Sequence, residues 1–130
     1  MIKFEKYHGL GNDFIIFNYK DLIAKNIKEE KFPEVAIKVC DRHTGIGADG
    51  MMVLVEKENS CQMIFINSDG SIGAMCGNGI RCFSNYVYNN NLLEGTKYKI
   101  ETLAGLLTLE IDASDEFNVK VNMGKYFLNN

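Results

Sequence analysis

The stretch Asn67-Ser-Asp-Gly-Ser-Ile-Gly-Ala-Met-Cys-Gly-Asn-Gly-Ile-Arg-Cys82 decides how the rest of the chain is interpreted. It joins one apolar run, Met63 to Ile66, to a second, Ile80 to Tyr88, which has the composition of a helix. Its glycines stand where the chain must turn between the two runs. Because Cys76 directly precedes Gly77-Asn-Gly79, we expect it at the N-terminus of that helix, where unpaired backbone N–H groups point outward.

The N-terminus of a helix attracts anions and stabilises a thiolate. It lowers a thiol pKa from about 8.5 into the ~3.5–7.5 range of activated cysteines, and the same N–H groups can hold a carboxylate. Cys76 is therefore the candidate reactive thiol, beside an anion site. The alternative is that Cys76 is a small buried apolar side chain, as most free cysteines are. The flanking glycines favour the chemical role.

Length and composition predict one soluble domain, residues 1–130, with its own core. The net charge of -3 and the absence of a basic stripe argue against a nucleic-acid partner. No run reaches about 18 apolar residues, and the N-terminus lacks the apolar region of a signal peptide, so no membrane partner is expected. These features predict a cytoplasmic protein.

The cysteines do not have the spacing of a zinc site. None of the four (Cys40, Cys61, Cys76 and Cys82) forms a C-x-x-C pair, so no metal is predicted. In a reducing compartment we expect all of them to remain thiols.

The first part of the chain predicts strands and short helices around a glycine-rich turn. Alternation favours a strand over Ile2 to Tyr7, and Phe14 to Phe17 is typical of a buried strand. Between them, His8-Gly-Leu-Gly-Asn-Asp13 is a tight turn in which Asn12 either caps the backbone or serves a site. A helical turn over Asp21 to Asn26 and a helix over Phe32 to Arg42 follow.

Gly45-Ile-Gly47-Ala-Asp-Gly50 has the spacing of a dinucleotide-binding loop, but its context is wrong. Such a loop leaves a strand and enters a helix, whereas this one leaves a helix and enters the strand Met51 to Glu56. The glycines therefore indicate a tight connection, in which His43 and Asp49 are expected to bond the loop backbone.

The second half predicts a hairpin, one enclosed helix and further strands. Met51 to Glu56 and Cys61 to Asn67 are separated by a short polar link, which favours an antiparallel hairpin. The helix is expected to begin at Gly77 and end near Asn90, with Ile80, Phe83 and Val87 in the core. The remaining predicted strands are Lys97 to Leu103, Leu106 to Ile111 and Phe117 to Met123. This order predicts an α+β fold, a mixed sheet wrapped as a barrel around a central helix.

Four motifs in one order resemble the N-terminal half of the diaminopimelate epimerase family. They are His8-Gly-Leu-Gly-Asn-Asp-Phe14, Arg42-His-Thr-Gly-Ile-Gly-Ala-Asp-Gly50, Asn67-Ser-Asp-Gly-Ser71 and Met75-Cys-Gly-Asn-Gly-Ile-Arg-Cys82. The segment Val121-Asn-Met-Gly124 is similar to the passage from that family's first domain to its second. The resemblance covers the whole chain and about half of the family's length.

The resemblance implies a cofactor-independent interconversion of L,L- and meso-diaminopimelate, with substrate held between two similar domains. Two thiols flank the α-carbon in that family, one acting as base and one as acid, and Cys76 matches the first. Gly77 and Asn78 match positions whose backbone N–H groups hold the substrate, and Asn12 and Asn67 match substrate-binding side chains. The expected ligand is a small amino acid.

Other functions stay open at this stage. Glycine at position 50, where some family members carry a substrate-contacting glutamine, leaves the specificity for the distal end of the substrate open. Lanthionine, histidine or another amino acid is an alternative substrate, because specificity in the family resides largely in the half without a counterpart here. The second thiol has no counterpart, so the expected partner is a missing C-terminal domain or a second copy of the chain. A non-catalytic amino-acid-binding or assembly module is a second class of function. An isomerase of the phenazine-biosynthesis or proline-racemase kind is a third.

Overall fold

The computed structural model describes residues 2–9, 11–73, 77–90, 92, 97–103, 105–110 and 120–126. Within them the strands are β1 (Ile2–His8), β2 (Asp13–Asn18), β3 (Gly50–Glu56), β4 (Cys61–Asn67), β5 (Lys97–Thr102), β6 (Gly105–Glu110) and β7 (Lys120–Tyr126). The helices are α1 (Tyr19–Ile23), a short 3₁₀ helix (Glu29–Lys31), α2 (Phe32–Cys40) and α3 (Gly77–Asn89). No helix in this part of the chain is long and apolar enough to cross a membrane.

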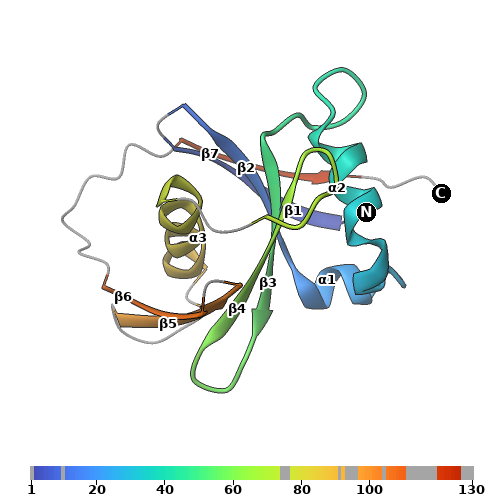
Figure 1. Ribbon diagram of the computed structural model, residues 1–130. Coiled ribbons are helices and arrows are strands. Elements are labelled where there is room, and N and C mark those ends of the chain that lie inside the picture. Colours follow the sequence, from blue (N-terminus) through green and yellow to red (C-terminus); the bar gives the residue numbers. More distant parts are fainter. Residues whose placement is uncertain are drawn as a thin grey trace.

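The strands of the described residues form one mixed sheet of seven, in the order β6-β5-β4-β3-β2-β1-β7. The β2–β3 and β4–β5 pairs are parallel and the others antiparallel. Figure 1 shows α3 on one side of this sheet and α1 with α2 on the other. The predicted α+β class and the β3–β4 hairpin are confirmed.

The sheet separates two apolar cores because side chains alternate along each strand. All six residues of β2 are buried. Phe14 and Ile16 belong to the core that includes Phe83 of α3, whereas Ile15 and Phe17 belong to the core on the side of α2. A strand buried on both faces is apolar throughout, which explains why Phe14 to Phe17 shows no alternation.

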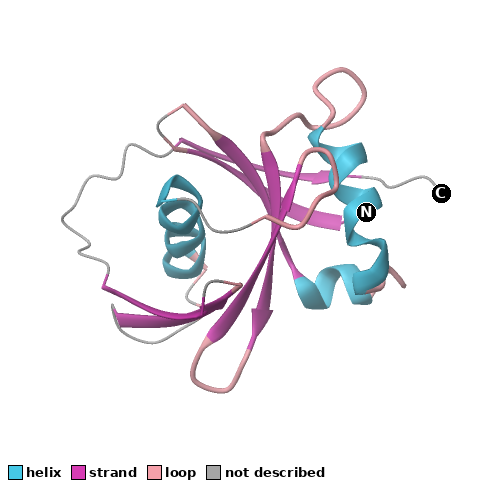
Figure 2. Ribbon diagram, viewed as in Figure 1, coloured by secondary structure: helices cyan, strands magenta, loops and turns pink. Residues whose placement is uncertain are grey.

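Helix α3 matches the prediction. It begins at Gly77 and ends at Asn89, and Phe83 and Val87 are fully buried. Ile80 is partly buried and packs against the same core. Burial continues without a break over residues 82–87, so the helix is enclosed on nearly all sides. The sheet curves around it, as Figure 2 shows.

The predicted closed barrel is not found. β6 and β7 are the two ends of the sheet, and no pairing joins them in the described residues. A helix with its side chains is about 10–12 Å across. In Figure 1, α3 lies between the arm formed by β5 and β6 and the arm formed by β1, β2 and β7. The enclosed helix therefore holds the two arms of the sheet apart.

Two predicted helix boundaries are wrong. The helical turn predicted over Asp21 to Asn26 begins at Tyr19, because the Asn18 side chain caps it by accepting from the Lys20 backbone N–H (3.2 Å). Helix α2 ends at Cys40 rather than Arg42, since Asp41 adopts an extended backbone. Pro33 lies in the first turn of α2, as expected. The early end of α2 places Arg42 in a loop.

Truncating the side chain of Phe83 tests whether α3 is enclosed. We expect Phe83→Ala to lower the free energy of unfolding by about 3–5 kcal/mol, because it leaves a cavity in a fully buried site. Tyr88→Ala is the matched control, since Tyr88 lies on the same helix and is 39% exposed, and should cost about 1 kcal/mol or less. Urea unfolding followed by circular dichroism measures both, and equal losses would contradict the enclosed helix.

Candidate functional site

The candidate site lies where four neighbouring strands meet their turns. The register pairs His8 with Asp13, Phe14 with Gly50, and Gly50 with Asn67. The β1–β2 turn, the α2–β3 loop and the loop after β4 therefore converge at one end of the sheet. The loop after β4 then leads toward α3. Three of the sequence motifs are thus brought together by strand pairing.

Asp13 and Asp49 join the first two of these loops by exchanging hydrogen bonds. The backbone N–H of Asp13 donates to Oδ2 of Asp49 (3.0 Å), and the backbone N–H of Asp49 donates to Oδ1 of Asp13 (3.0 Å). The Asp49 N–H also lies 2.9 Å from the Asp13 carbonyl oxygen. Each carboxylate thus fixes the backbone that carries the other, and the two loops are held as one unit.

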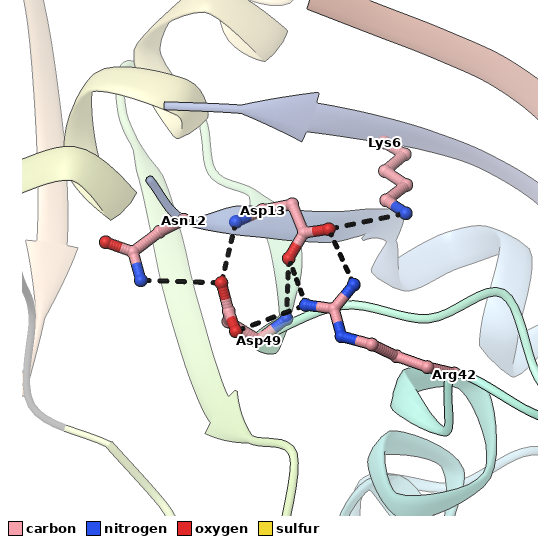
Figure 3. Close-up of polar contacts among 5 residues, drawn as sticks. All are labelled: Lys6, Asn12, Asp13, Arg42 and Asp49. Carbon is pink, nitrogen blue, oxygen red and sulfur yellow. Dashed lines mark hydrogen bonds and ion pairs between the residues drawn. The ribbon is translucent and has the colours of Figure 1, made fainter. Parts of the chain in front are cut away.

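Arg42 and Lys6 neutralise this pair of carboxylates (Figure 3). Arg42 binds Asp13 with both terminal nitrogens, Nη1 to Oδ2 at 3.1 Å and Nη2 to Oδ1 at 2.8 Å, and Nη2 also reaches Oδ1 of Asp49 at 3.2 Å. Lys6 Nζ approaches Oδ2 of Asp13 from the strand side at 3.4 Å. Such two-pronged pairing fixes geometry as well as charge.

The electrostatics keep Asp13 ionised. Burial acts to raise its pKa, but the hydrogen bonds from Arg42 and from the Asp49 backbone outweigh this and hold the pKa well below its usual range. The same contact with Asp13 raises the pKa of Arg42. Both groups are therefore charged throughout the neutral range.

Asn12 lies at the edge of this network, in an open hollow of about 360 Å³ lined by His8, Gly9, Gly11, Asn12, Asp13, Arg42 and Asp49. Its Nδ2 faces Oδ2 of Asp49 at 3.4 Å, and Figure 3 shows Oδ1 on the opposite side of the amide. Gly11, at φ +84°, supplies the left-handed backbone that this turn requires. The predicted site residue Asn12 thus belongs to a polar hollow.

Asn67 ends β4 beside the same loops. The Ser68 backbone N–H donates to the Asp49 carbonyl oxygen (3.3 Å), which connects the loop after β4 to the α2–β3 loop. Asn67 itself is half-buried, and its Nδ2 donates to Oγ of Ser71 at 3.1 Å. A Cβ at Gly73 would overlap the Phe65 ring and lie 3.1 Å from Asn67 Nδ2, so only glycine fits there.

The remaining predicted site residues belong to the start of α3. Gly77 is the first residue of that helix, as predicted, and Asn78 is the second. Cys76 and the side chain of Asn78 lie outside the described residues. Their roles at the site therefore remain predictions.

The other three cysteines are buried, as expected for inert thiols. Burial raises the pKa of Cys40, and nearby Asp13 adds to the effect, to about 12. Burial, with smaller contributions from acidic neighbours, likewise raises the pKa of Cys61 to about 12. Cys82 is fully buried in α3. Cys40 and Cys61 are therefore thiols near neutral pH, and burial keeps all three side chains away from a ligand.

Sequence reasoning missed the central roles of Asp13 and Arg42. Asp49 was expected to bond loop backbone and does so, but across to the β1–β2 turn. For His43, the described residues show no side-chain hydrogen bond to the loop backbone. Oδ1 of Asp41 accepts instead from the backbone N–H groups of His43 (2.8 Å) and Thr44 (3.1 Å). The available signal was the position of Asp13 and Arg42, each a charged residue close to a glycine-rich turn. Groups of His, Cys, Asp or Glu able to hold a metal ion are absent from the described residues.

A sequence model described as diaminopimelate epimerase matches residues 4–128. The chain belongs to the diaminopimelate epimerase family. The diaminopimelate epimerase of Alkaliphilus metalliredigens is 46% identical over 98% of this chain, which covers 44% of that protein. That of Bacillus cytotoxicus is 44% identical over 93% of this chain and 42% of its own length. The chain spans less than half the length of these diaminopimelate epimerases.

Solved structures more distant than the diaminopimelate epimerases share the fold. A PhzF-family phenazine biosynthesis protein from Enterococcus faecalis has a TM-score of 0.68 at 10% identity, covering 86% of this chain and 41% of that one. A PhzF-family phenazine biosynthesis protein from Bacillus anthracis has a TM-score of 0.67 at 22% identity, and the match covers 94% of this chain and 40% of that one. A methylitaconate-delta-isomerase has a TM-score of 0.65 at 12% identity, and the match covers 86% of this chain and 35% of that one. At these identities the likeness shows the fold alone.

Replacing Asp13 tests the network through the dependence of stability on pH. The folded-state pKa of Asp13 lies below its ordinary value of 3.8, so the carboxylate stabilises the fold above about pH 4. This stabilisation is lost as the pH falls below about 4 toward the lower folded-state pKa. We expect Asp13→Asn to lower the free energy of unfolding at pH 7 by about 2 kcal/mol, the order expected for hydrogen bonds to a charged group. The loss of stability below pH 4 should be smaller in this variant.

Urea unfolding between pH 7 and pH 2.5 provides the measurement. Glu58→Gln is the control, because it removes a carboxylate from the exposed β3–β4 turn. A pH profile for Asp13→Asn that coincides with that of Glu58→Gln would show that the Asp13 carboxylate does not stabilise the fold.

Proposed function

We propose that residues 1–130 form one domain of a cytoplasmic diaminopimelate epimerase that works without pyridoxal phosphate. The observation that carries this proposal is the 46% identity, over 98% of the chain, to a diaminopimelate epimerase. The convergence of Asn12 and Asn67 on adjoining loops, in a chain that continues to the start of α3, supports it.

In this proposal Cys76 supplies one of the two thiols that exchange the α-proton. An amino-acid α-proton is a very weak acid, so inversion needs a base on one face of the carbon and an acid on the other. The backbone N–H groups of Gly77 and Asn78, at the N-terminus of α3, hold the α-carboxylate and ease the charge that develops on it. Asn12 and Asn67 bind the other polar groups of the substrate.

The second thiol must come from outside these residues. Cys40, Cys61 and Cys82 are buried, so they cannot face the substrate. The chain covers 44% of the A. metalliredigens diaminopimelate epimerase, which favours a second domain as the missing half. A second copy of the chain, with Cys76 facing its mate, is the other arrangement that gives two thiols.

A non-catalytic amino-acid-binding or assembly module is the second candidate. The observation that favours it is the burial of Cys40, Cys61 and Cys82, since residues with a single accessible thiol can bind a ligand without exchanging its α-proton. Histidine and lanthionine remain alternative ligands. Gly50 has no side chain that could distinguish diaminopimelate, histidine and lanthionine. It is also buried, and a Cβ there would lie 3.2 Å from the Phe65 ring.

Cys76 should be the most reactive of the four thiols. We expect iodoacetamide at neutral pH to label Cys76 first, because the other three thiols are buried and those of Cys40 and Cys61 have a pKa of about 12. Peptide mapping of the native protein gives the order. Earlier labelling of any of the other three would remove Cys76 from the proposed role.

A chimera tests catalysis directly. This chain alone should not exchange the α-proton of L,L-diaminopimelate, because it lacks the second thiol and half of the water-excluding cleft. Joined to the remaining part of the A. metalliredigens epimerase, it should catalyse the entry of solvent deuterium at the α-carbon of the substrate. The full-length A. metalliredigens epimerase, assayed in parallel, is the positive control. In the chimera, Cys76→Ala should lower the exchange rate at least about 100-fold.

The controls separate the candidate functions. Cys61→Ala in the chimera removes a buried thiol at the start of β4, the end opposite Asn67, and should keep the exchange rate. A folded chimera that binds diaminopimelate without exchange would support the binding module instead. Exchange by a monomer of this chain, shown by sedimentation, would contradict the two-thiol mechanism.

A further inference from the structure

We propose that Ser71 and Asp69 are positioning residues that fix the side-chain amide of Asn67, so that its Oδ1 serves as an acceptor for an ammonium group of the ligand. The inference rests on the proposed function and deepens it, because it assigns the amide nitrogen of Asn67 to the protein and the amide oxygen to the amino-acid ligand. It rests on the loop that follows β4.

That loop folds back on the end of β4. The backbone N–H of Asn67 donates to the Ser71 carbonyl oxygen (2.8 Å), and the Gly70 N–H donates to the Asn67 carbonyl oxygen (2.9 Å). Gly70, at φ +88°, allows the reversal, and a Cβ there would meet Ile37 of α2 at 3.0 Å. The loop is thereby packed against α2, and Ser71 is held beside the Asn67 side chain.

The direction of each hydrogen bond in this loop follows from chemistry. Oδ1 of Asp69 accepts from both the backbone N–H and the hydroxyl of Ser71, at 2.9 and 2.6 Å. These bonds lower the pKa of Asp69, so it is ionised near neutral pH and can only accept. The single hydroxyl proton of Ser71 is therefore committed to Asp69. Its Oγ can only accept from Asn67, 3.1 Å away.

The Asn67 amide has one group that can donate to Ser71, namely Nδ2. The relay from Asp69 through Ser71 thus selects one of the two amide orientations and turns Oδ1 away from Ser71. An amide oxygen accepts hydrogen bonds and cannot donate them, so its partner must be a donor. Among the charged groups of an amino acid, the ammonium is a donor and the carboxylate is not.

The other predicted substrate-binding asparagine has the same polarity. Nδ2 of Asn12 faces Oδ2 of the Asp49 carboxylate at 3.4 Å. Both amides therefore turn their nitrogen toward a partner anchored by an aspartate, Asn12 directly and Asn67 through Ser71.

Nuclear magnetic resonance of this chain tests the orientation of the Asn67 amide. Ser71→Ala should shift the Asn67 Nδ2 proton resonances upfield and speed their exchange with water, because the acceptor is lost. Ser71→Thr keeps the hydroxyl and should preserve the wild-type signals. Ser60→Ala, at the opposite end of β4, is the matched control. Unchanged Asn67 signals in Ser71→Ala would overturn the proposed relay.

Ligand titration followed by the same spectra tests recognition of ammonium. Diaminopimelate and pimelate share one carbon chain and two carboxylates, and differ in the ammonium groups. The wild-type chain and Ser71→Thr should bind diaminopimelate at least about 10-fold more tightly than pimelate. Ser71→Ala should reduce this ratio about 5-fold or more, while Ser60→Ala should retain it.

The outcomes are distinct from those that decide the proposed function. Equal affinity for the two ligands in the wild-type chain, or binding of neither, would overturn the inference. So would a ratio that survives in Ser71→Ala. Failure of the chimera to exchange deuterium would instead remove the catalytic function, and the measured ratio of affinities would still decide the role of Ser71 and Asp69.

Discussion

The exchange of hydrogen bonds between Asp13 and Asp49 is the contact on which the site depends. Strand pairing brings the two loops to the same end of the sheet, but pairing alone does not fix two glycine-rich turns. The reciprocal bonds do so, and Arg42 and Lys6 supply the positive charge that makes two adjacent carboxylates tolerable. The Asn12 amide nitrogen faces this network, so the proposed ligand-binding role of Asn12 depends on a structural ion cluster.

The two-sided sheet explains how a small chain supports this arrangement. α2 packs on one face and ends early enough to release Arg42 into the loop that meets Asp13. α3 packs on the other face and begins at Gly77, shortly after the loop that carries Asn67. The same sheet therefore positions an asparagine at the end of one strand and a helix N-terminus a few residues further along the chain.

Much of the fold could be predicted because the signals were local. Alternation marked β1, the polar link between two apolar runs marked the β3–β4 hairpin, and Gly77 marked the start of α3. Barrel closure could not be predicted, since it depends on how far the sheet curves around the enclosed helix. The end of α2 was predicted two residues too late because arginine is a good helix former, whereas Arg42 lies beyond the helix and pairs with Asp13. Asn12 and Asn67 were predicted as site residues from the motifs that resemble the family, whereas no pattern indicated that Asp13 pairs with Arg42.

The sequence by itself determined the family, the α+β class and the positions of the glycine-rich turns, and it supplied the candidate residues for the chemistry, because these follow from residue types and short spacings. Only the tertiary structure decided which charges meet and which way the amides face. Asp13 and Asp49 are far apart in the chain, and their contact exists because β2 and β3 pair in parallel register. The polarity of Asn67 likewise depends on a loop folding back until one hydroxyl proton has a single acceptor. Such choices depend on distances of about 3 Å between specific atoms, which no spacing in the sequence specifies.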